Sequence, residues 1–150
     1  MTTRAIALVL LVTASLLVAV VLRRRDGRSR VVTDASTLSG EDLGAPLGAA
    51  ATFVQFSGAT CAPCRPVRRT LAELAATRPD VVHIDLDAEE RLDLVRRHRV
   101  LATPTVLLLD ATGQVRRRLT GAVDRARVLE ELAAVVASSP ERVQARVQHG

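Results

Sequence analysis

The sequence predicts an α/β fold in which helices cover both faces of a mixed sheet, preceded by one transmembrane helix. Three observations support this prediction. Short apolar runs alternate with helical stretches between residues 51 and 98, the pattern of parallel strands joined by crossovers. Two more apolar runs then flank a glycine-containing turn and precede a helix, which predicts an antiparallel hairpin. Finally, residues 5–22 form an unbroken run of 18 residues without a charge.

The run at residues 5–22 has the length and composition of a membrane anchor. As a helix it spans about 27 Å, close to the roughly 30 Å of hydrocarbon in a bilayer. Three arginines end it, which favours a retained anchor over the alternative of a cleaved signal peptide. Five arginines follow the run by residue 30 and one precedes it. The positive-inside rule therefore predicts a single-pass protein of the cell membrane with its main domain in the cytoplasm; the alternative places that domain outside.

Three segments follow the anchor. Residues 23–50 are expected to be a basic flank and linker, because turn-forming residues are frequent there. Residues 51–137 form the folded domain, and 138–150 form a flexible tail that begins with a Ser-Ser-Pro helix stop. The folded domain holds 13 arginines against 11 acidic residues and no basic stripe interleaved with aromatics, so we expect no nucleic-acid binding.

Within the domain the apolar pattern predicts seven elements. Strands are expected at 51–57, 81–87, 105–110 and 114–120, and helices at 62–77, 88–98 and 125–137. The first strand is strengthened by Phe53, Val54 and Phe56. The helix at 62–77 carries an apolar stripe at helical spacing, with two prolines in its first turn, where a missing N–H costs least. Asp124 is the expected N-cap of the last helix.

The motif Cys61-Ala62-Pro63-Cys64 contains the only two cysteines of the chain. It lies at the expected junction between the first strand and its helix. Two thiols at this spacing can close and reopen a small disulfide ring, and a helix start favours the thiolate form of the first thiol. The motif therefore predicts a dithiol oxidoreductase. The alternatives are an inert pair or half of a metal site, but no second C-x-x-C and no histidine at ligand-like spacing accompany it.

With these features the chain resembles thioredoxin-fold proteins over roughly residues 50–137. The resemblance rests on the strand–C-x-x-C–helix unit, the strand at 81–87, the Thr103-Pro104-Thr105 segment before the next strand, and the closing hairpin and helix. It implies a three-layer α/β/α fold with a mixed sheet of four to five strands. It also implies protein disulfides or dithiols as substrates, an upstream thiol reductant or oxidant as partner, and no cofactor or metal.

The resemblance further implies roles for single residues. Cys61 would be the exposed nucleophile and Cys64 the buried resolving thiol. Pro104 would be a cis-proline facing the disulfide, so that the backbone of Thr103 pairs with an extended substrate. Thr60 and Pro63, which flank Cys61, would complete the substrate-binding set.

Departures from the family pattern affect the expected chemistry. Thr60 replaces a tryptophan, Gln55 stands where thioredoxins bury an aspartate, and His83 aligns with the lysine that accompanies that aspartate. Glutamine cannot take a proton from Cys64, so we treat Gln55 and His83 as candidates for a changed proton relay. For His83 the alternative is a strand residue satisfied by hydrogen bonds.

Three functional hypotheses remain open at this point. The first is a membrane-tethered thiol–disulfide oxidoreductase, which the intact C-x-x-C and the Thr-Pro segment favour. The second is a non-catalytic docking module, which the missing tryptophan and aspartate favour. The third is an electron relay or redox sensor for one membrane partner.

Overall fold

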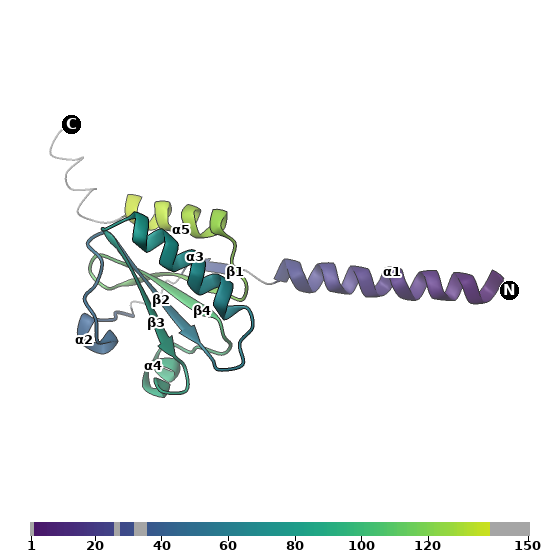
Figure 1. Cartoon of the computed structure of the whole chain (residues 1–150), viewed down its shortest axis with the longest axis horizontal. Coiled ribbons are helices and arrows are strands. Elements are labelled where there is room, and N and C mark those ends of the chain that lie inside the picture. Colours follow the sequence, from purple (N-terminus) through teal and green to yellow (C-terminus); the bar gives the residue numbers. More distant parts are fainter. Residues whose placement is uncertain (1, 26–27, 32–35, 139–150) are drawn as a thin grey trace.

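The structure is a computed structural model that describes residues 2–25, 28–31 and 36–138 (Figure 1). Five strands form one sheet: β1 (Arg28–Val31), β2 (Ala51–Ser57), β3 (Val81–Asp87), β4 (Thr105–Asp110) and β5 (Val115–Thr120). Their order across the sheet is β1-β5-β4-β2-β3. The β2–β3 pair is parallel and the other pairs are antiparallel, so the predicted mixed sheet is confirmed.

Helices cover the two faces of the sheet, as Figure 1 shows. The helices of the domain are α2 (Gly40–Leu43), α3 (Cys64–Thr77), α4 (Leu92–Arg97) and α5 (Arg125–Ala137). Side chains of α3 and α5 pack in one buried cluster, and side chains of α2 and α4 pack in a second cluster on the opposite face. The domain therefore has the three layers that the family resemblance implied.

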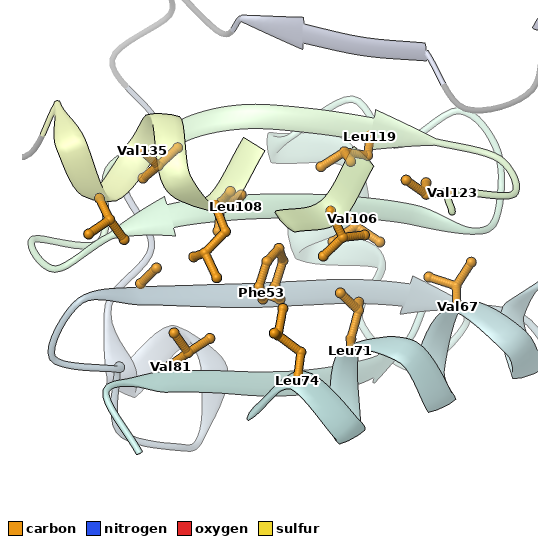
Figure 2. Close-up of a cluster of buried hydrophobic side chains, with 14 residues drawn as sticks. Phe53, Val67, Leu71, Leu74, Val81, Val106, Leu108, Leu119, Val123 and Val135 are labelled. Carbon is orange, nitrogen blue, oxygen red and sulfur yellow. The ribbon is translucent and has the colours of Figure 1, made fainter. Parts of the chain in front are cut away.

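Figure 2 shows the cluster under α3 and α5. Phe53 of β2 lies at its centre with no exposed surface, and Leu71 of α3 and Leu108 of β4 are equally buried. Each such side chain contributes about 1.5–3 kcal/mol of burial free energy. Strand β2 contributes side chains to this cluster on one face and to the second cluster on the other. Packing on both faces therefore fixes the position of its end at Ser57, where the cysteine loop begins.

Several elements differ from the sequence prediction. The helix expected from residue 62 begins at Cys64, with Pro63 as its N-cap. The helix expected at 88–98 is limited to Leu92–Arg97, because the Asp87 carboxylate accepts a hydrogen bond from the N–H of Glu89 and holds a turn there.

The segment at 23–50, predicted as a linker, contributes structure to the domain. It contains β1, which pairs with β5 and forms one edge of the sheet, and α2, which begins with a capping box between Ser39 and Asp42. The predicted tail at 138–150 lies outside the described residues, except for Ser138.

Helix α1 (Thr2–Arg25) precedes the domain and extends away from the sheet in Figure 1. Its described apolar side chains are exposed, for example Leu11 at 68%. Taking only the residues that the structure describes, no helix is long and apolar enough to cross a membrane. The structure therefore gives the predicted anchor at residues 5–22 no support.

Candidate active site

The two cysteines lie where β2 passes into α3, at the carboxyl end of a parallel strand. A short loop follows Ser57, and the N–H of Cys61 donates to the carbonyl of Gly58 in that loop. Cys61 and Cys64 form a disulfide with an S–S distance of 1.97 Å and a Cα–Cα distance of 5.4 Å. Cys61 is partly exposed, whereas Cys64, the first residue of α3, is only 2% exposed. The pair thus combines a partly exposed cysteine with a buried one.

The Thr103–Pro104 segment lies beside this loop, before β4. Its peptide bond is cis, and the carbonyl of Pro104 accepts a hydrogen bond from the N–H of Gly121. Gly58 permits the close approach of this segment, because a Cβ there would lie 3.2 Å from Oγ1 of Thr103. Strand β4 is the antiparallel neighbour of β2, and this pairing brings Thr103 to the cysteine loop although Cys61 and Thr103 are 42 positions apart in sequence (103 − 61).

A groove with a volume of about 490 Å³ begins at Pro63 and Thr103, and we call it the arginine groove. Three arginines line it together with small and apolar residues. The lining residues are Arg30, Pro63, Arg99, Leu101, Ala102, Thr103, Thr105, Arg118, Thr120, Gly121 and Ala122. Leu101 is 94% exposed on its rim. The predicted contact residues Pro63 and Thr103 therefore share one hollow, whereas Pro104 is buried and Thr60 is exposed in the cysteine loop.

The three arginines of this groove differ in their hydrogen bonds and in their backbone positions. Arg118 donates to the backbone carbonyls of His98 and Arg99, and burial lowers the pKa of its guanidinium. Arg99 has a positive φ of 48°, in the left-handed region that non-glycine residues rarely adopt. Arg30 lies opposite Arg118 in the β1–β5 pairing. Strands β1 and β5 and the segment after α4 thus bring positive charge to the groove beside Pro63 and Thr103.

A second hollow of about 440 Å³ opens on the disulfide itself, and we call it the cysteine cleft. Charged residues from α3, β3 and the loop after β3 line it. The lining residues are Ser57, Gly58, Ala59, Cys61, Cys64, Arg65, Arg68, Asp85, Asp87 and Glu90. Both sulfur-bearing residues are thus connected to a polar space that contains three carboxylates and two guanidinium groups.

A chain of polar contacts leads from Cys64 to the wall of this cleft. Gln55, with no exposed surface, donates from Nε2 to the carbonyl of Cys64 at 3.1 Å and to Oγ of Ser57 at 2.9 Å. The Ser57 hydroxyl donates to Oδ1 of Asp85 at 2.5 Å, and Arg68 pairs with Oδ2 of Asp85 at 2.5 Å. In the described part of the chain, Oε1 of Gln55 has no hydrogen-bond partner.

His83 lies on the same sheet face but is not part of this chain of contacts. The β2–β3 register places it beside Phe53 and places Asp85 beside Gln55. Burial lowers the pKa of His83, Asp85 opposes the shift and Arg68 adds to it. Its Nε2 is buried without a hydrogen-bond partner among the described residues. The proposed relay through His83 therefore stays a prediction that no contact to Gln55 or Cys64 supports.

Sequence reasoning missed Ser57 and Asp85. The available signal was the alternation of strand residues: Gln55 and Ser57 face the same side of β2, and Asp85 faces the same side of β3 as His83. Their contact required the parallel register of two strands, which the pattern of apolar residues did not provide.

Comparison with known proteins finds matches to this domain among sequences and solved structures. A family model described as a thioredoxin-like domain matches residues 45–136. Thioredoxin H5 of Oryza sativa subsp. japonica is 32% identical over 68 residues, which are 45% of this chain and 50% of that protein. A thioredoxin of Mycobacterium bovis is 34% identical over 85 residues, 56% of this chain and 72% of that protein. The crystal structure of a thioredoxin from Nicotiana alata aligns with a TM-score of 0.51 at 26% identity, covering 57% of this chain and 73% of that one.

Proposed function

Because this chain belongs to the thioredoxin-like domain family, we propose that it is a thiol–disulfide oxidoreductase that exchanges its Cys61–Cys64 pair with protein disulfides. One observation carries the proposal. The partly exposed Cys61 is joined to the 2% exposed Cys64, beside a groove that begins at Thr103. An accessible attacking sulfur and a covered second sulfur are what a two-step exchange requires.

The exchange balances over two steps. The Cys61 thiolate attacks one sulfur of the substrate disulfide, whose S–S bond breaks as the other sulfur leaves with the electron pair. Cys64 then loses its proton and attacks Cys61, which releases the second substrate thiolate and closes the Cys61–Cys64 disulfide. The substrate gains two electrons and the protein loses two. An upstream dithiol must restore them, and a strong oxidant upstream would drive the same steps in reverse.

The arginine groove supports a peptide as the substrate. The proposal places an extended segment of the substrate along Thr103, with its disulfide over Cys61. Leu101, 94% exposed on the rim, offers an apolar contact, and Arg30 and Arg99 offer positive charge. An acidic or mixed apolar–acidic segment fits this lining by charge complementarity.

Reduction of insulin by the full chain, with dithiothreitol as electron source, tests the function. We expect the natural protein to turn over and Cys61→Ser to lose turnover, because serine cannot supply the attacking thiolate. Cys64→Ser is the matched control: reduced beforehand and mixed with insulin in the absence of dithiothreitol, it retains the first attack and accumulates a covalent mixed disulfide visible on a non-reducing gel. Turnover retained by Cys61→Ser, or no exchange by the natural protein, would leave a docking module as the better hypothesis. Exchange with one membrane partner but not with insulin would favour a dedicated relay or sensor.

We also propose that residues 5–22 tether the domain to the cell membrane, with the domain on the cytoplasmic side. The uncharged 18-residue run, the exposed apolar side chains of α1 and the arginines after the run support this placement. Fusion of a topology reporter after residue 150 tests it. Signal from a cytoplasm-specific reporter in the membrane fraction is expected; signal from the opposite reporter would reverse the orientation, and release of the protein by high pH wash would contradict the tether.

A further inference from the structure

The second step of the proposed exchange needs a group that takes the proton of Cys64. Cys64 is 2% exposed and is the first residue of α3, and the hollow that it lines is the cysteine cleft. Gln55 is the polar side chain beneath it, donating to its carbonyl at 3.1 Å. An amide neither gains nor loses a proton at ordinary pH. The proton must therefore leave through another group.

The cysteine cleft offers three carboxylates, and they are not equivalent. Asp87 is used by its own turn, where Oδ1 accepts from the N–H of Glu89 at 2.7 Å. Glu90 is exposed on the loop that follows. Asp85 is the one linked inward, because it accepts from Ser57, which in turn accepts from Gln55. Its side chain is 26% exposed, so it can pass a proton on to solvent.

Sheet geometry explains why this carboxylate reaches the disulfide. Strands β2 and β3 are parallel and in register, with Gln55 beside Asp85 and Ser57 beside Asp87. Side chains two apart on a strand share a face, so Gln55, Ser57 and Asp85 all face α3. Arg68, on α3, pairs with the outer oxygen of Asp85 and leaves the inner oxygen to Ser57.

From this arrangement we propose that Asp85 accepts the proton of the Cys64 thiol through water in the cysteine cleft, and that Ser57 and Gln55 position it. This inference rests on the proposed function. As the proton moves to Asp85, the Cys64 sulfur attacks the Cys61 sulfur, the bond from Cys61 to the substrate breaks, and the substrate sulfur leaves with the electron pair. Asp85 then returns its proton to solvent.

Other charged groups around Asp85 contribute to the field at this site. They come from helix α3, from strand β3 and from the loop after it. They are Arg65, Arg68, His83, Asp87 and Glu90. A test must therefore separate proton acceptance from the loss of one negative charge in this set.

The chromogenic aryl disulfide dithionitrobenzoate makes that separation. Mixed in excess with the reduced full chain in detergent, it yields a first aryl thiolate when Cys61 attacks and a second when Cys64 resolves the mixed disulfide. The two phases are followed separately in a stopped-flow spectrometer from about pH 5 to 9. Asp85→Asn keeps the shape of the side chain and an oxygen for Ser57 but cannot accept the proton. We expect it to slow the second phase at least about tenfold near neutral pH and to leave the first phase within about twofold.

The direction of the effect excludes a field explanation. Removal of a negative charge near Cys64 favours the Cys64 thiolate and would accelerate the second phase. Loss of a proton acceptor slows it. Glu90→Gln is the matched control, because it removes one negative charge from the same cleft without touching Ser57; its second phase should be unchanged or slightly faster.

The outcomes separate this inference from the proposed function. A second phase of Asp85→Asn at or above the natural rate, or equal slowing by Glu90→Gln, would overturn the role of Asp85 while the exchange function stands. No first phase in the natural protein would overturn both. Recovery of the second phase in Asp85→Asn/Gln55→Asp, which moves the carboxylate to the neighbouring strand, would support the inference. If Asp85→Asn does not fold, Ser57→Ala is the variant to measure. A slowed second phase would support the positioning of Asp85 by Ser57, and an unchanged second phase would overturn it.

Discussion

The arginine groove and the cysteine cleft both border the cysteine motif, since Pro63 lines the groove and Cys61 and Cys64 line the cleft, but the two hollows differ in charge. The groove is lined by three arginines and, among the residues that the structure describes, by no carboxylate. The cleft is lined by three carboxylates and two arginines. One of these arginines, Arg68, already pairs with Asp85 inside the cleft, whereas no ion pair within the described ranges involves Arg30 or Arg99.

This difference indicates a division of labour. Charges that are paired within the domain hold one another in place, as Arg68 and Asp85 do against Ser57. A group of positive charges with no carboxylate among them, as in the groove, attracts an anionic partner from outside. We therefore assign proton handling at Cys64 to the cleft and substrate recognition to the groove. Changes in the groove should then depend on the substrate, and changes in the cleft should not.

Reversing one groove charge tests this assignment most strongly. Arg99→Glu should lower kcat/KM for an acidic peptide disulfide about tenfold, since losing one attraction and gaining one repulsion at this exposed site amounts to about 1–2 kcal/mol. An uncharged peptide disulfide should be turned over nearly as before. The difference between the two peptides should shrink at high ionic strength, because salt screens exposed charges. Steady-state kinetics with both peptides at low and high salt measures it.

Arg69→Glu is the matched control for the groove. Arg69 is exposed on α3 and lines neither hollow, yet the substitution changes the net charge by the same amount. It should reduce the rate with the acidic peptide by less than about twofold. Equal losses in both variants would mean that overall charge, rather than the groove, selects the substrate.

Elements with local signals could be predicted from the sequence. Apolar alternation and helical stripes located β2 to β5, α3 and α5, because each pattern reports a face buried by its own element. The four-residue helix α2 is too short to have a period, and its capping box lay in a turn-rich segment. The expected extent of α4 was wrong because the turn held by Asp87 replaces its first residues.

The same distinction applies to the site. Cys61, Cys64 and Pro104 belong to short motifs and could be named from the sequence. The contact between Ser57 and Asp85 joins residues 28 apart, and it depends on the register of two strands. A change of register by one residue would turn Asp85 to the other face of the sheet. Long-range contacts of this kind therefore could not be predicted from one sequence.

Two histidines, His83 near the cleft and His98 near the groove, give the smallest expected effect, a dependence of stability on pH. His83 lies on β3 beside the residues of the cleft, and burial lowers its pKa, with opposed effects of Asp85 and Arg68. His98 follows the last residue of α4, and neither of its ring nitrogens has a hydrogen-bond partner among the described residues. Its carbonyl accepts a hydrogen bond from Arg118 of the groove. Burial also lowers the pKa of His98, and Arg118 adds to the shift.

Lowered histidine pKa values make stability depend on pH in a defined direction. The unfolded chain binds these protons at about pH 6.5, whereas the folded chain binds them only at lower pH. The contribution of the two neutral histidines to the free energy of unfolding is therefore fully present above about pH 6.5. It is lost as the pH falls below this value toward the pKa values of the folded chain. Asp42, which opposes the shift of His98, has its pKa lowered to about 2 by hydrogen bonds from Ser39, so it stays ionised in this range.

We expect urea unfolding between about pH 5 and 7.5 to give a free energy of unfolding that decreases on acidification. His98→Gln should flatten this dependence more than His83→Gln, because His98 is 3% exposed and both its ring nitrogens are without a described partner, whereas His83 is only partly buried and has one such nitrogen. The slope against pH is the readout, since either substitution can shift the absolute stability. A natural protein that gains stability on acidification, or a slope that survives in both variants, would show that these histidines do not bind protons on unfolding. If His83→Gln flattened the pH dependence more than His98→Gln, His83 beside the cleft, rather than His98 beside the groove, would be the histidine whose pKa is lowered more on folding.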